Sequence, residues 1–166
     1  MISESTLNQM RESLRQSQGE LVQMLDRVDE ATLHQPHGEE NWSLAVMLAH
    51  LTEARPYFAR QAETLITTPG TIVGRTLDNE QRVEAIIDAQ RFQLSRDQLK
   101  QQLLDSHTVI MRLLASLSEA QLQMACTHAR LGATTLGDFI RGSIVDHDQA
   151  HVQQAKTFLQ TGSSAQ

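Results

Sequence analysis

Two histidines lie four residues apart in the stretch IVDHDQAHVQQA, within a segment that otherwise has the pattern of a buried helix face. Side chains four residues apart on an α-helix project from the same side, about 6 Å apart along the axis. His147 and His151 could therefore share one metal ion. A third ligand must come from another helix, and His50 is the candidate because it interrupts the apolar stripe of a predicted helix over residues 44–66.

Three neutral imidazoles can hold a divalent cation and leave positions for water or substrate, which is typical of a catalytic site. Nitrogen ligands favour Zn²⁺, Ni²⁺ or Fe²⁺ over Mg²⁺ or Ca²⁺. Glu53, one turn after His50, could orient that imidazole by a hydrogen bond or act on a water at the metal; Asp148 lies one turn before His151. Because the chain has seven histidines, a metal-free histidine core is the alternative interpretation.

The sequence offers no convincing protein nucleophile. A single cysteine, Cys126, excludes an internal disulfide, and a small buried hydrophobe is a better interpretation of it than a reactive thiolate. We find no glycine-rich phosphate loop and no serine in a nucleophile elbow. These absences are consistent with a metal ion that activates a thiol or a water.

Helical spacing of apolar residues predicts the elements that would position these side chains. The long helices are expected over residues 7–28, over 44–66, from Ser95 to about Leu117, and from Thr134 or Thr135 to about Leu159. Ser95 and Gln98 form a capping box, and residues 80–92 could form a shorter helix. The sequence thus predicts one all-α domain, residues 1–166 with a polar tail from about 160. Its architecture would be a four-helix bundle with a long crossover between helices two and three.

Composition and charge exclude several function classes. The chain is 40% hydrophobic and only 4% aromatic, which suits helices better than sheets. Its net charge of −6, without a basic stripe, argues against a nucleic-acid partner. No apolar segment approaches the ~20 residues that span a bilayer, and the N-terminus lacks the features of a signal peptide. We therefore expect a soluble, cytoplasmic protein without a membrane partner.

Several stretches together resemble the DinB-like superfamily. NWSLAVMLAHLTEA is similar to the Trp-Ser start of its second helix, and THARLGATTLGDFIRGSIVDHDQAHVQQA to its loop and last helix. The similarity extends from LDRVDEATL to AKTFL. The resemblance implies an up-down-down-up bundle, a metal held by His50, His147 and His151, and a homodimer. Nickel, zinc, iron and manganese are associated with such sites.

The resemblance also implies an activity. Members include S-transferases and isomerases that use low-molecular-weight thiols, so we expect a thiol-dependent S-transferase, or a related hydrolase or isomerase, acting on a small electrophilic molecule. Nickel or zinc is the expected cofactor, ahead of iron or manganese, with Glu53 as the candidate catalytic residue. The competing hypothesis is a non-catalytic, dimeric stress-response or binding module with a structural or vestigial metal site.

Overall fold

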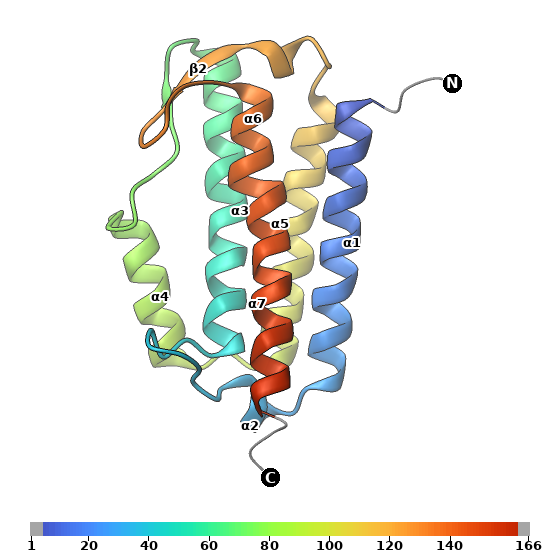
Figure 1. The fold of residues 1–166 in the computed structure, drawn as a ribbon, viewed down its shortest axis with the longest axis vertical. Coiled ribbons are helices and arrows are strands. Elements are labelled where there is room, and N and C mark those ends of the chain that lie inside the picture. Colours follow the sequence, from blue (N-terminus) through green and yellow to red (C-terminus); the bar gives the residue numbers. More distant parts are fainter. Residues whose placement is uncertain (1–4, 163–166) are drawn as a thin grey trace.

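The computed structural model, which describes residues 5–162, is a four-helix bundle (Figure 1). The first three long helices are α1 (Thr6–Arg27), α3 (Leu44–Thr67) and α5 (Arg96–Ser116). The last one consists of α6 (Leu136–Ile140), a π-helical segment (Arg141–Val145) and α7 (Asp146–Gly162). These elements confirm the all-α bundle predicted from the apolar spacing, with a short α2 (Glu30–Leu33) between α1 and α3.

The helices run up-down-down-up, which confirms the predicted connectivity (Figure 1). Helices α3 and α5 are parallel neighbours, because the chain returns to the starting end of the bundle between them. That crossover contains β1 (Ile72–Val73) and α4 (Glu80–Phe92), and α4 packs along α3. Helix α7 packs against α1 and α3, so the second and fourth helices lie side by side.

Side-chain caps fix the starts of the helices. Ser5, Ser43 and Ser95 each accept a hydrogen bond from the backbone N–H three residues later. The side chain of Gln98 in turn accepts a hydrogen bond from the backbone N–H of Ser95, so the expected capping box is present. Among the described helices, none is long and apolar enough to cross a membrane.

A small sheet, which the sequence did not predict, joins the crossover to the loop before the last helix. Strand β2 (Ala125–His128) pairs with β1 in parallel and with β3 (Gly132–Thr135) in an antiparallel hairpin. This sheet lies at the end of the bundle where α6 begins (Figure 1). It ties the crossover to the element that leads into the two C-terminal histidines.

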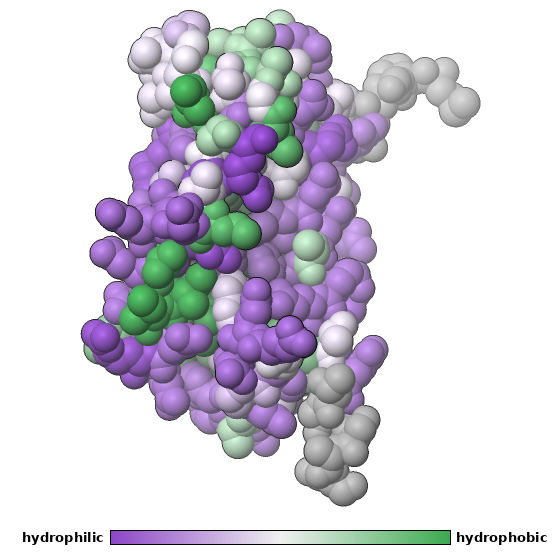
Figure 2. Space-filling model, turned by 60° about the vertical axis from the view of Figure 1, so that its left-hand side comes forward, coloured by the Kyte–Doolittle hydropathy of each residue, from purple (hydrophilic) through white to green (hydrophobic). Residues whose placement is uncertain are grey.

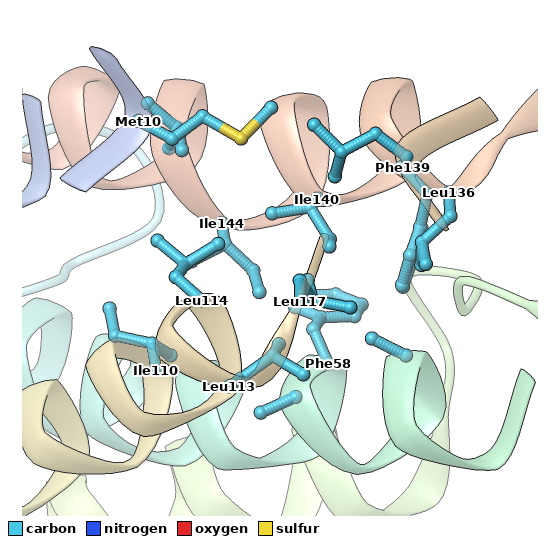
Figure 3. Packing of buried hydrophobic residues seen from close by; sticks show 14 of the residues in the cluster. Met10, Phe58, Ile110, Leu113, Leu114, Leu117, Leu136, Phe139, Ile140 and Ile144 are labelled. Atoms are coloured by element: carbon cyan, nitrogen blue, oxygen red, sulfur yellow. The ribbon is translucent and has the colours of Figure 1, made fainter. Parts of the chain in front are cut away.

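The core consists of two apolar clusters with a charged layer between them. Figure 3 shows one cluster, to which Met10 of α1, Phe58 of α3, Leu114 of α5 and Ile140 of α6 all contribute. The other cluster lies nearer α2 and consists mainly of side chains from the same four long helices. Hydrophobic burial in both clusters stabilises the bundle and holds α3 against α7.

Arg55 and Asp148 form the centre of the charged layer and are almost fully buried, at 1% and 0% exposed. The Arg55 guanidinium donates to Asp148 Oδ2 from Nη2 at 2.7 Å. Its Nη1 also donates to Gln18 Oε1, to the backbone oxygen of Leu103 and to Ser106 Oγ. Helices α1, α5 and α7 thus each contribute a partner to the buried cation that α3 carries.

Candidate metal centre

The structure brings His50, His147 and His151 together, although His50 lies on α3 and the other two on α7. The Nε2 atom of His147 lies 3.3 Å from that of His50 and 3.2 Å from that of His151. Two nitrogens bound tetrahedrally at about 2.0–2.1 Å from one ion would lie roughly 3.3–3.4 Å apart. Both measured spacings therefore fit a shared transition metal, and the ligand atoms of all three imidazoles lie within 4.8 Å of one another.

Burial keeps these imidazoles neutral. His50 is only 4% exposed, and loss of hydration lowers its pKa to about 3; burial lowers the pKa of His147 to about 2. Burial also lowers the pKa of His151, against the opposing influence of Gln154 and Asp148. A neutral imidazole has a free lone pair on one nitrogen, so the cluster offers ligands rather than positive charges at neutral pH.

Gln154 determines which nitrogen of His151 faces the cluster. The Nδ1 atom of His151 lies 2.8 Å from Gln154 Oε1, an acceptor, so Nδ1 carries the proton and Nε2 keeps its lone pair. Partners of this kind orient metal ligands and raise their basicity. Buried His50 Nδ1 has no hydrogen-bond partner among the described residues. The sequence analysis missed Gln154, although its position three residues after His151 is a usable signal.

Glu53 is placed elsewhere than the sequence analysis expected. Its two carboxylate oxygens accept hydrogen bonds from Arg75 Nη1 and Nη2, both at 2.7 Å, and Gln81 Nε2 donates to it at 2.9 Å. Its carboxylate is thus bound by two residues of the crossover, and no hydrogen bond joins it to His50. Asp148, likewise, is bound by Arg55.

The three histidines line a cavity of about 440 Å³ between the bundle, the crossover and the β2–β3 hairpin. Trp42, Phe58 and Phe139 form an apolar part of the cavity wall. Gly142 and Ser143 of the π-helical segment also line this cavity. Arg75, Arg82 and Arg130 also line the cavity, and the sequence analysis identified none of them. A second cavity of about 530 Å³ lies on the α4 side and is lined by Glu53 without the histidines.

π-Helical turns inside α-helices occur frequently at functional sites. Here the segment Arg141–Val145 directly precedes His147 and its backbone reaches the cavity through Gly142. The extra residue in this turn sets the rotation of α7 relative to α6. The π-helical segment thus contributes to where His147 and His151 point.

Solved structures share this fold. YfiT from Bacillus subtilis, described as a probable metal-dependent hydrolase with an unusual four-helix bundle topology, superimposes with a TM-score of 0.79 at 15% identity. The match covers 98% of this chain and 91% of that chain. The mycothiol-dependent maleylpyruvate isomerase matches with a TM-score of 0.69 at 16% identity, over 90% of this chain and 62% of that one.

A further neighbour bears on the expected partners. The colibactin self-resistance protein ClbS, solved in complex with double-stranded DNA, matches with a TM-score of 0.71 at 11% identity, over 96% of this chain and 98% of that one. The absence of a nucleic-acid partner here therefore stays a prediction. At such identities, the likeness shows the fold alone.

No curated protein matches the sequence. The family model for the DinB superfamily, however, matches residues 13–155, a range that contains all three histidines. The match spans most of the bundle and agrees with the fold, so the resemblance noted in the sequence is confirmed. The chain belongs to the DinB superfamily.

Proposed function

We propose that this protein is a metal-dependent enzyme that acts on a small electrophilic molecule, with His50, His147 and His151 as the ligands of one divalent transition metal. The observation that carries the proposal is the convergence of three Nε2 atoms of residues that line one cavity. Such an ion, nickel or zinc in the first place and iron or manganese otherwise, lowers the pKa of a coordinated thiol or water and so supplies a nucleophile at neutral pH.

The residues of the chain prepare the site in three ways. Burial keeps the imidazoles unprotonated, and Gln154 holds His151 in the ligand tautomer. The apolar wall of Trp42 and Phe58 limits the access of bulk water. We assign Glu53 the task of holding Arg75 against this wall, in place of the catalytic role first considered.

Both a thiol and a water remain candidates for the activated group. A probable metal-dependent hydrolase and a mycothiol-dependent isomerase among the structural neighbours support one each. Thiol transfer and hydrolysis should therefore be screened side by side, with several low-molecular-weight thiols, and with metal-free protein as the blank.

The first experiment is elemental analysis by mass spectrometry of protein purified without an affinity tag. We expect about one equivalent of a transition metal in the wild type and in the control His34→Ala, and little in His147→Ala. Gln154→Leu should bind the same metal roughly 10–100-fold more weakly, because it removes the partner of a ligand and not the ligand. A folded His147→Ala with the metal content of the wild type would refute the proposed ligand set.

An exposed apolar face supports a second candidate, a module that binds a protein partner or a second copy of the chain. Figure 2 shows an apolar area on the face that carries α4, whose Val83, Ile87 and Phe92 are 37%, 46% and 65% exposed. Light scattering of the wild type and Phe92→Ser tests for a dimer. If the metal only stabilises such a module, chelation will lower the melting temperature and no thiol or ester substrate will turn over.

A further inference from the structure

Three arginines from three separate segments of the chain line the cavity that contains the histidines. Arg75 follows β1, Arg82 lies on α4, and Arg130 lies in the turn between β2 and β3. This gathering stands out in a protein with a net charge of −6, in which 20 acidic residues outnumber 14 basic ones. Like charges brought together near a cavity raise the local potential and attract anions.

Arg75 is a fixed part of the wall. It is 8% exposed, and its guanidinium makes a two-pronged contact with Glu53 at 2.7 Å for both hydrogen bonds. The guanidinium carbon also lies 4.4 Å from the ring centre of Tyr57 and 5.2 Å from that of Phe58. Glu53 forms a salt bridge with Arg75, which leaves Arg82 and Arg130 as the two cations of the cavity lining without a salt bridge among the described residues.

Neither Arg82 nor Arg130 forms a salt bridge with any described residue. Arg82 is half-buried, and its Nη1 donates to the backbone oxygen of Leu77 at 2.7 Å, which holds the side chain in place. Burial lowers the pKa of Arg82, and the nearby charges of Arg75 and Arg130 add to this, with Glu40 and Glu53 opposing. The shared cavity lining places the three cations near one another, and Arg75 and Arg130 both act on Arg82 through their charge.

The two carboxylates that line the cavity form no salt bridge with either arginine. Asp138 is exposed, and its side chain accepts a hydrogen bond from the Thr135 hydroxyl at 2.8 Å, as part of the cap of α6. Glu40 is also exposed, and its charge acts on Arg82 without forming an ion pair. Water screens both carboxylates, so they offset the charge of the two arginines only weakly.

His128 fixes the turn that carries Arg130. Its Nδ1 accepts hydrogen bonds from the backbone N–H groups of Arg130 and Leu131, at 3.1 and 3.2 Å. His128 itself is buried against Gly74, where a methyl group would overlap the imidazole. The backbone beneath Arg130 is thus held rigidly, which lowers the entropy cost of binding a ligand there.

We infer that the cavity takes a small molecule with an anionic oxygen group, a carboxylate or a phosphate, that binds to Arg82 and Arg130 while its remaining part extends toward the three histidines. The inference rests on the proposed function for the role of the histidines, but the anion site itself consists of residues outside the metal ligands. Guanidinium groups bind both kinds of anion through paired hydrogen bonds.

The test is titration calorimetry with three probes that share one ring: phenylacetate, phenyl phosphate and the neutral phenylacetamide. The proteins are the wild type, Arg82→Gln/Arg130→Gln, and the control Arg60→Gln/Arg112→Gln. The control removes the same charge at two exposed positions that do not line the cavity. Each protein is measured after chelation and again after one equivalent of Zn²⁺, with its metal content determined in parallel.

We expect at least one acid to bind the wild type and the control alike, and the cavity variant at least tenfold more weakly, with phenylacetamide weaker than either acid. The acid that loses more affinity identifies carboxylate or phosphate as the preferred group. Equal affinity of the wild type and the cavity variant, or no binding of either acid, would overturn the inference. The metal content reports separately on the histidine site, so a failure of the metal proposal is recognised even when the acids bind.

Discussion

Replacing Asp148 with asparagine should destabilise the protein by about 3–5 kcal/mol, because the change leaves a buried guanidinium without its counter-charge. Arg55 is 1% exposed and cannot move into water without opening the bundle. Arginine also cannot lose its proton, so the unpaired buried charge cannot be removed by deprotonation. Three hydrogen bonds from Arg55 to the carboxylate are affected, since Nε reaches both oxygens at 3.2 Å and Nη2 reaches Oδ2 at 2.7 Å.

The opposite variant, Arg55→Met, should have a similar cost at pH 8 but a smaller one at pH 5. Burial raises the pKa of Asp148 and Arg55 is the largest opposing influence, so removal of Arg55 raises that pKa further. Between the unfolded and folded pKa values, the folded state then binds more protons, and the stability of the variant falls as the pH rises. A protonated Asp148 avoids the burial of an unpaired charge.

Urea unfolding of chelator-treated proteins at pH 8 and pH 5 measures both effects, each variant against the wild type at the same pH. A loss of about 4 kcal/mol corresponds to a melting temperature lower by roughly 8–16 °C for a domain of this size. The double variant Arg55→Met/Asp148→Leu should recover most of the loss, because apolar replacement of both partners removes the buried charges. Asp148→Asn within 1 kcal/mol of the wild type would refute the reasoning.

Three other predictions follow from the structure. Metal-free protein should lose stability as the pH falls below 6.5, the ordinary histidine value, because the folded pKa values of His50 (about 3) and His147 (about 2) lie lower and the unfolded chain is protonated first; a flat thermal profile from pH 8 to 5 would contradict this. Gly74→Ala should destabilise by at least about 1 kcal/mol, because φ is +84° and the methyl group would overlap His128, whereas Gly19→Ala in an open part of α1 should stabilise by about 0.5–1 kcal/mol in the same unfolding assay. Labelled duplex DNA should show no anisotropy change at micromolar protein, because the net charge is −6, and saturable binding would overturn that expectation.

The helices and the histidine cluster could be predicted because both depend on local pattern. Serine caps and apolar spacing define where α3 and α5 begin. Both signals involve residues only a few positions apart, so they can be recognised in the sequence. Two helices that bury their apolar stripes in one core bring equivalent positions together, so His50 had to approach His147 and His151 once α3 and α7 packed side by side. The approach of the three histidines could therefore be predicted from the apolar stripes and the order of the helices alone.

Features that depend on distant pairing could not be predicted. The strands are only two to four residues long, and β1 pairs with β2 across more than fifty positions, so no periodicity reveals them. Arg55 resembles an ordinary helical charge until its partner, 93 positions away, is known. The π-helical segment leaves one faint signal, the Gly142–Ser143 pair inside a helix, where bends are common.

The charged layer also constrains the order in which the chain assembles during synthesis. Helices α1, α3 and α5 leave the ribosome before α7, and together they hold Arg55 with three neutral acceptors but no carboxylate. A three-helix intermediate would therefore keep its centre hydrated, and with His50 alone it has one of the three imidazoles. Docking of the last helix neutralises the cation and completes the imidazole cluster in one step. If the three histidines bind a metal as proposed, the complete ligand set exists only after the last helix has docked, so metal binding would follow folding.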